Sequence, residues 1–297
     1  MARESDDNPW HYKFTWNPRN VILAGQGGSA TYLKNGGVEL CPPHRLFQEV
    51  TRVEVPGRGF FEGYANRDSL GYADIYGLEG VDTLVRGTLR GPGFCAGWDV
   101  IFQLGMNRAD AEVKWPVGMT WLQFTAAFVP GCGPTSTASE VAAAVTLMTG
   151  CKPETMEKLE WLGLFEEEPI GVKEGSPADV LQDLLEKKWA LSETDIDLIV
   201  MWHRFKFIDQ DGTPRVKRSW LALRGEDYLH TAMSKTVGLP LALAARHIVR
   251  GDWNFSGLIM PTEQRIYKPL LAVLKEEGVG FTEDAGADAE AAEKSRR

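Results

Sequence analysis

The order of its predicted strands and helices places this chain in the α+β class. Short runs that alternate apolar and polar residues, or that are rich in β-branched and aromatic residues, are typical of strands. Such runs occur at 52–55, 59–64, 85–90, 197–208 and 216–224. The central region, 107–190, instead has mostly helical spacing of its apolar residues. Strands that lie before and after a helical block favour an α+β fold.

The predicted strand that ends at Arg90 has two chemically different sides. Successive side chains of a strand point to opposite faces. Val85 and Leu89 therefore share an apolar face, and we expect both to pack into a core. Arg86, Thr88 and Arg90 share the other face, which carries two guanidinium groups with a hydroxyl between them.

A second cationic position precedes this strand. Asp68 or Ser69 can cap a helix over 70–76, which Gly77 then ends. Arg67 would lie at the mouth of that helix, where free backbone N–H groups favour an anion. Together with the arginine face, this predicts a site for an anionic small molecule. The alternative is a solvated charged surface beside a simple capping turn.

Further helices are predicted from apolar spacing and from their end signals. They span 93–104, 120–128, 139–148, 153–164, 177–189, 228–249 and 264–277. Ser176 and Asp179 have the spacing of a capping box, with Pro177 in the first helical turn. The run 238–240, Gly-Leu-Pro, should interrupt or kink its helix, because proline donates no helical hydrogen bond. We interpret 107–190 as a packing or dimerisation subdomain.

The glycine-rich run 25–30 formally matches the dinucleotide fingerprint G-x-G-x-x-A, after a short buried segment at 21–24. The fingerprint requires a helix directly after the glycine turn. Here four residues lead straight into Asn35-Gly36-Gly37, which leaves no room for that helix. We therefore predict no cofactor site in this run.

Composition restricts the class of partner. The chain has 297 residues, 43% of them hydrophobic and 25% charged, with a net charge of −9. This charge argues against nucleic acid and against an anionic membrane surface as the main partner. The four cysteines show neither zinc-ligand nor Cys-x-x-Cys spacing, so we expect reduced thiols and no metal site. Neither a secretory signal nor a membrane-spanning run is visible, and we expect a cytoplasmic protein, with an organelle as the alternative.

Several sequence runs resemble the substrate domain of the glutamate-forming saccharopine dehydrogenases, also called saccharopine reductases. The runs are Glu62–Leu70, Arg86–Arg90, Gly93–Cys95, Ala232–Pro240, Asn8–Pro9 and Tyr12–Trp16. With weaker matches between them, the resemblance covers roughly residues 8–283, in order. It implies a polar lead-in at 1–9, a substrate domain at 10–283 with a mixed sheet covered by helices, and a disordered tail at 284–297.

The resemblance implies a reaction and a set of ligand contacts. Members of the family reduce, with NADPH, the imine that 2-aminoadipate 6-semialdehyde forms with glutamate, and the product is saccharopine. Carried over to this chain, Arg67, Thr88, Leu89 and Arg90 would contact this tricarboxylate, with both arginines on carboxylates. Arg86 shares their face and would act behind them. No general acid is evident.

Three further side chains are candidates for a role in the reaction, namely Tyr64, Asp68 and Lys235. The lysine lies one turn before the expected helix break, and a solvated charge is the favoured explanation for it.

In the family, the dinucleotide fingerprint belongs to a nucleotide-binding half that lies upstream of the substrate domain. We do not recognise that half in this sequence. We therefore expect NADP to bind the complete enzyme rather than this chain alone, and a separate Rossmann-domain chain as a partner. We also expect a homodimer. Two alternatives stay open: a non-catalytic binding or dimerisation module derived from the enzyme, and a related reductive aminase with another amino acid or polyamine substrate.

Overall fold

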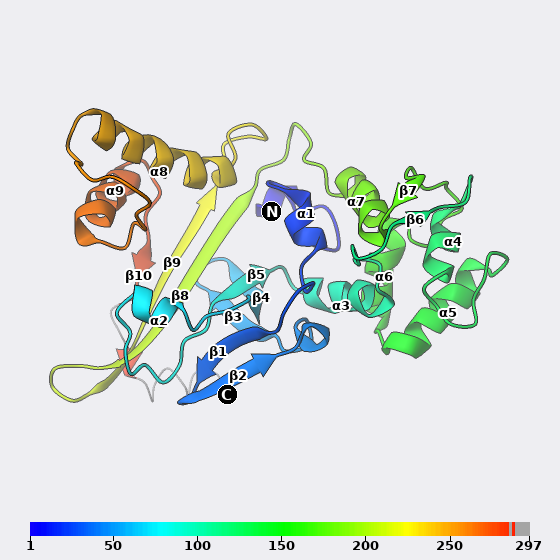
Figure 1. The fold of residues 1–297 in the computed structure, drawn as a ribbon, viewed down its shortest axis with the longest axis horizontal. Coiled ribbons are helices and arrows are strands. Elements are labelled where there is room, and N and C mark those ends of the chain that lie inside the picture. Colours follow the sequence, from blue (N-terminus) through cyan, green and yellow to red (C-terminus); the bar gives the residue numbers. More distant parts are fainter. Residues whose placement is uncertain (285–286, 289–297) are drawn as a thin grey trace. The chain divides into compact units, whose positions relative to one another are not determined.

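A computed structural model describes residues 1–284 and 287–288 of the chain and confirms the α+β class. Most of the tail predicted at 284–297 lies outside the described residues. The chain divides into two compact units. The first comprises 1–5, 55–59 and 193–297, and the second comprises 6–54 and 60–192. Figure 1 shows the elements of both units.

The second unit holds three small antiparallel sheets (Figure 1). Its described strands are β1 (Ala30–Lys34), β2 (Gly37–Cys41), β3 (Thr51–Val55), β4 (Gly59–Ala65), β5 (Gly87–Arg90), β6 (Val113–Lys114) and β7 (Glu174–Gly175). β1 pairs with β2, β6 pairs with β7, and β4 lies between β3 and β5. One parallel bridge, between Thr31 and Asp68, connects β1 to the segment after β4. Antiparallel ladders, rather than one extended sheet, therefore carry the strands of this unit.

Seven described helices complete the second unit. They are α1 (Pro18–Ile22), α2 (Tyr72–Ile75), α3 (Phe94–Leu104), α4 (Trp121–Ala126), α5 (Ala138–Thr149), α6 (Pro153–Leu162) and α7 (Pro177–Lys188), and a 3-10 turn spans Pro43–Arg45. The block from α4 to α7 confirms the predicted helical region. The segment at 21–24, expected to be buried, contributes Val21 and Ile22 to the core from the short helix α1.

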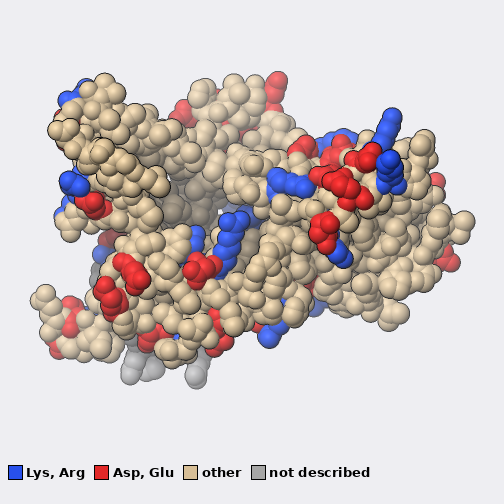
Figure 2. All heavy atoms as spheres, in the orientation of Figure 1, with Lys and Arg blue, Asp and Glu red and all other residues tan. Residues whose placement is uncertain are grey.

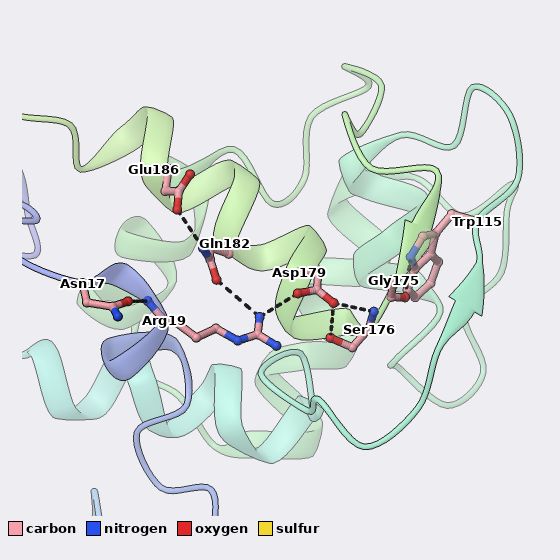
Figure 3. A network of polar contacts seen from close by, with 8 residues as sticks. All are labelled: Asn17, Arg19, Trp115, Gly175, Ser176, Asp179, Gln182 and Glu186. Atoms are coloured by element: carbon pink, nitrogen blue, oxygen red, sulfur yellow. Dashed lines mark hydrogen bonds and ion pairs between the residues drawn. The ribbon is translucent and has the colours of Figure 1, made fainter.

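The start of α7 shows how local sequence and tertiary contact combine (Figure 3). Ser176 and Asp179 form the predicted capping box, since the Asp179 carboxylate accepts from both the amide and the hydroxyl of Ser176. The Arg19 guanidinium of α1 donates to the other carboxylate oxygen at 2.7 Å and to the Gln182 side chain at 3.3 Å. One carboxylate thereby caps a helix and also joins α1 to α7.

An aromatic cluster forms the centre of the second unit's core. Edge-to-face contacts, the arrangement that ring quadrupoles prefer, connect Trp10 to Phe94, Trp98 and Trp189. The Trp10 indole N–H donates to the Lys158 carbonyl at 3.0 Å. This indole lies so close to α3 that a Cβ on Gly97 would come within 2.6 Å of it. The segment that carries Trp10 is therefore fixed directly against α3.

The first unit is built on a long hairpin. β8 (Leu198–Ile208) pairs with β9 (Pro214–Arg224) over eleven residue pairs, which confirms the hairpin predicted around the turn at 209–212. β10 (Thr282–Glu283) and β11 (Ala287–Asp288) pair with the other edge of β9, and a 3-10 turn spans Arg3–Ser5. Helices α8 (Ala232–Val249) and α9 (Gln264–Glu276) supply the remaining core. That core is formed by Leu221, Leu243, Ile266, Leu270, Leu274 and Val279.

Two helix predictions need correction. α8 begins at Ala232 rather than 228, because the Asp227 carboxylate holds 227–230 in a turn through the Leu229 and His230 amides. It also continues through Pro240 without interruption. In α2, the helix expected over 70–76 is reduced to 72–75.

Figure 2 shows acidic and basic side chains in small mixed groups on the face that it draws. Within the part of the chain that the structure describes, no helix combines the length and the apolar character that a membrane crossing needs.

Candidate functional site

Arg90 ends β5 in an aromatic frame. In the antiparallel register it lies opposite Glu62 of β4. Its guanidinium carbon lies 5.1 Å from the ring centre of Tyr12 and 5.1 Å from that of Phe94. Aromatic rings at this distance stabilise a cation without neutralising its charge. The side chain is half-buried, so its solvation is already reduced.

The charge of Arg90 has no protein counter-ion among the described residues. Its Nε is shielded from solvent and makes no hydrogen bond. Burial raises the pKa of Tyr64 and of Tyr12, and the positive charge of Arg90 opposes this shift in both. A half-buried guanidinium with an unused donor suits an anionic ligand, because leaving such a donor unpaired costs free energy.

The carboxylate opposite Arg90 has a different partner. Glu62 Oε1 accepts from the Gly93 amide at 2.7 Å, and Oε2 accepts from the Cys95 amide at 2.9 Å. These are orphan donors at the start of α3, which has no side-chain cap of its own. Both oxygens of Glu62 therefore accept from backbone amides, and among the described residues no ion pair joins Glu62 to Arg90.

Contacts within the N-terminal segment fix the position of Tyr12, one of the two rings beside Arg90. Asn8 donates to the Tyr12 carbonyl at 3.1 Å and accepts from the Trp10 amide at 3.0 Å. The buried Lys158 ammonium donates to the Pro9 carbonyl. The early matching runs, which are far from β5 in sequence, therefore lie beside Arg90 in the folded chain.

Thr88 and Leu89 lie on opposite faces of β5. Thr88 is the register partner of the buried Tyr64, so it shares the face of Arg90. Leu89 packs over Gly63, where an added Cβ would lie 3.4 Å from the Leu89 side chain and 3.4 Å from that of Val53. A ligand on the Arg90 face can therefore meet the Thr88 side chain, but only the backbone of Leu89.

Arg86 is engaged within the protein. Its guanidinium donates to the Asp68 carbonyl at 3.3 Å and lies 3.9 Å over the Tyr72 ring. Its amide donates to the buried Ser69 hydroxyl at 2.9 Å. The role of Arg86 behind the ligand stays a prediction.

The helix mouth predicted beside Arg67 needs correction. The Asp68 carboxylate accepts from the Leu70 and Gly71 amides at 2.9 and 3.3 Å, and from the Thr31 hydroxyl at 2.7 Å. These N–H groups are therefore occupied rather than free for an anion. Arg67 itself is exposed and has a left-handed backbone, φ 54°, which is uncommon for a residue with a side chain. Its own side chain is what remains to meet a ligand.

The β4–β5 ladder separates the two predicted clamp residues along its length. Arg67 follows the end at which Ala65 pairs with Gly87, whereas Arg90 lies at the other end of β5. Three residues of strand correspond to roughly 10 Å of backbone. Arg86 lies at the Arg67 end, since its carbonyl accepts from the Asn66 amide. A shared ligand with guanidinium groups some 6–14 Å apart stays a prediction.

The core position predicted for Val85 is wrong, since this side chain is 50% exposed. The reason is that β5 begins only at Gly87, so the alternation does not extend to Val85. Leu89, inside the strand, is half-buried.

Lys235 belongs to the first unit and pairs there with Glu226 at 3.8 Å. The glycine-rich run at 25–30 leads directly into strand β1, so the helix that a dinucleotide requires does not follow it.

The sequence analysis did not predict that Glu62, Lys158 and Tyr12 lie around Arg90 and the turn that follows it. Glu62 and Tyr12 both fall within matching runs, which was the available signal. Lys158 carries no such signal, because its contact with Pro9 joins residues 149 positions apart.

A half-buried arginine, framed by two aromatic rings, ends a strand of a small antiparallel sheet, and the chain is therefore an α+β protein with a candidate anion site. Residues 1–279 match the family model of the saccharopine dehydrogenase C-terminal domain. The chain belongs to this family, whose enzymes act in lysine metabolism, and the predicted resemblance is thereby confirmed.

Named relatives agree with this assignment. Over 95% of its length the chain is 36% identical to the mitochondrial alpha-aminoadipic semialdehyde synthase of Bos taurus, and it covers 30% of that protein. It is 31% identical to the saccharopine dehydrogenase [NADP(+), L-glutamate-forming] of Saccharomyces cerevisiae, with 93% of the chain and 62% of that protein covered. The apo structure of the yeast L-Glu-forming enzyme superposes with a TM-score of 0.85 at 27% identity, covering 96% of this chain and 64% of that one. The chain therefore spans less than two thirds of these relatives.

Proposed function

We propose that this chain supplies the saccharopine-binding part of an NADP-dependent, glutamate-forming saccharopine dehydrogenase. The observation that carries the proposal is Arg90, whose guanidinium has no protein counter-ion among the described residues and has a buried, unused Nε. Saccharopine bears three carboxylates, and the planar guanidinium fork is suited to bidentate carboxylate binding. Family membership supports saccharopine as the anion, since relatives are named saccharopine dehydrogenase.

The residues around Arg90 have distinct roles in this proposal. Arg90 binds one carboxylate, and Thr88 on the same face orients the ligand through its hydroxyl. Arg67, exposed beyond the other end of the ladder, binds a second carboxylate of the extended ligand. These groups bind and align the imine carbon. NADPH, when bound to the complete enzyme, would supply the hydride, and hydride transfer depends mainly on such alignment.

We further propose that NADP binds outside residues 1–279, with a Rossmann domain as the expected partner of this domain. The glycine-rich run of this chain does not fit a dinucleotide, whereas its relatives are NADP(+)-dependent and extend well beyond the matched region. Apolar side chains are exposed on α8 and in the segment after it, including Val237, Leu241 and Leu258, the last fully exposed. A nucleotide-binding domain that covers these residues would remove them from water.

The experiment is calorimetric titration of the chain with saccharopine. Arg90→Ala and Arg67→Ala should each weaken binding by about 2–3 kcal/mol, the scale of a lost hydrogen bond to a charged group. The matched control is Arg52→Ala, because Arg52 also stacks on a ring in the same sheet, at 4.1 Å from Phe60. Equal losses in all three variants would show a general charge effect and refute the site. Absence of binding in the unmodified chain would favour a non-catalytic module.

A further inference from the structure

We infer that Glu62 is a positioning residue for ligand binding, acting through Arg90, and this inference rests on the proposed function. Its carboxylate accepts from the two amides that flank Phe94, namely those of Gly93 and Cys95. The Phe94 ring is one wall of the Arg90 frame. By fixing the backbone on each side of Phe94, Glu62 fixes that ring and the turn that follows Arg90.

The geometry also determines the charge that a ligand meets. Glu62 is the cross-strand partner of Arg90, and opposite charges in that relation ordinarily attract. A carboxylate with free oxygens would compete there with the ligand. Because the Gly93 and Cys95 amides take one oxygen each, Glu62 orients the arginine's surroundings through the backbone of α3.

Lys158 fixes the same turn from the other side. Its side chain packs over Gly93, where an added Cβ would lie 2.8 Å from Lys158 Cε. Gly93 has φ 77°, so only glycine suits the position both in space and in conformation. Burial lowers the pKa of Lys158, and the negative charge of Glu62 opposes this shift. The turn after Arg90 is therefore held between a carboxylate and an ammonium group.

A double-mutant cycle with saccharopine tests the inference. Glu62→Gln, Arg90→Ala and the double variant are titrated as full chains. Replacement by glutamine puts an NH₂ group against one of the two amides, and we expect about tenfold weaker binding. Because Glu62 acts through Arg90, the double variant should bind no more weakly than Arg90→Ala alone. Losses that multiply in the double variant would overturn the inference.

The control is Glu140→Gln, because Glu140 also caps a helix, accepting from the Thr137 amide at 2.8 Å. It should leave saccharopine affinity unchanged. If Glu62→Gln fails to fold, Glu62→Asp replaces it, since the shorter side chain keeps the charge but reaches only one amide. An affinity equal to that of the unmodified chain in Glu62→Asp would also overturn the inference.

A readout without ligand separates this inference from the proposed function. The Nε–H resonance of Arg90 in an ¹⁵N correlation spectrum should shift in Glu62→Gln and stay fixed in Glu140→Gln. If Arg90→Ala does not weaken saccharopine binding, the proposed function fails, and the resonance decides the positioning role alone. An Arg90 signal that is unmoved by Glu62→Gln would overturn that role.

Discussion

At the scale of single residues, two carboxylates decide which positive charges are left for a ligand. Both Glu62 oxygens accept from amides of α3, and Arg90 has no counter-ion among the described residues. Asp68 is taken up by its own turn and by Thr31, so it does not engage the neighbouring Arg67 through these oxygens. Acidic residues beside the predicted clamp therefore shape its backbone rather than neutralise it.

Asp68 should give the protein a measurable pH dependence of stability. The Thr31 hydroxyl, followed by the Leu70 and Gly71 amides, lowers the pKa of this carboxyl from its ordinary value of 3.8. A lowered folded-state pKa means that the stabilisation is present above 3.8 and is lost as the pH falls through the folded value. Asp68→Ala should therefore unfold at lower urea concentration than the unmodified chain at pH 7, and the difference should shrink at pH 3.

The control for this prediction is Glu79→Ala, which removes an exposed carboxylate from the loop after α2. It should unfold like the unmodified chain at both pH values. A difference between Asp68→Ala and the unmodified chain that persists at low pH would contradict the assigned cause, because the lost contacts would then be independent of ionisation.

At the scale of elements, the N-terminal segment and α3 pack against each other and carry the two rings, Tyr12 and Phe94, that lie beside Arg90. Tyr12 comes from the first and Phe94 from the second, and Trp10 holds the two together. Strand β5 brings the arginine between them. The frame exists only when all three elements are in contact.

Gly97→Ala tests this contact. A Cβ at Gly97 would lie 2.6 Å from the Trp10 ring, which is closer than a real Cβ approaches and requires the ring to shift. Overpacking of this kind costs about 1–3 kcal/mol. Chemical denaturation should show that loss, and titration should show weaker saccharopine binding. Gly238→Ala is the control, since an added Cβ there meets nothing within 4 Å. Unchanged stability in Gly97→Ala would mean that the segment is not packed as described.

At the scale of the whole molecule, the proposed substrate site and the cofactor of the relatives would belong to different parts of the enzyme. Arg90 and its frame lie in the second unit, within the part that matches the relatives. The relatives are NADP(+)-dependent, yet the glycine-rich run of this chain leads into a strand. Binding of the two reactants should therefore be separable by experiment.

The isolated chain should accordingly bind saccharopine but not NADPH. The reason is that a pyrophosphate needs the N-terminus of a helix directly after the glycine turn, and β1 occupies that place. Fluorescence titration with NADPH measures this, with saccharopine titration of the same sample as the positive control. A micromolar dissociation constant for NADPH would contradict the prediction and make 25–30 a candidate site again.

The sequence by itself determined the class of fold, the main helices and the long hairpin. These follow from signals that act within a few residues: apolar periodicity, the capping box of Ser176 and Asp179, and the turn between β8 and β9. Arg90 and Thr88 were predicted as ligand contacts because both belong to one continuous run, Arg86–Arg90, that resembles the family. Local rules also excluded a dinucleotide helix after residue 28, and strand β1 occupies that place.

Tertiary structure alone decided that strand β5, with its alternating side chains, begins at Gly87. Val85 lies before that strand, and its side chain is exposed to solvent. Tertiary structure also decided that Asp68 fills the N–H groups beside Arg67, and that Glu62 binds α3 rather than the arginine opposite it. The partners of a buried charge come from segments that are distant in sequence, as in the contact between Lys158 and Pro9. Which carboxylate or ring meets a given guanidinium depends on packing, because the contact energies are small and only the folded chain brings the groups together.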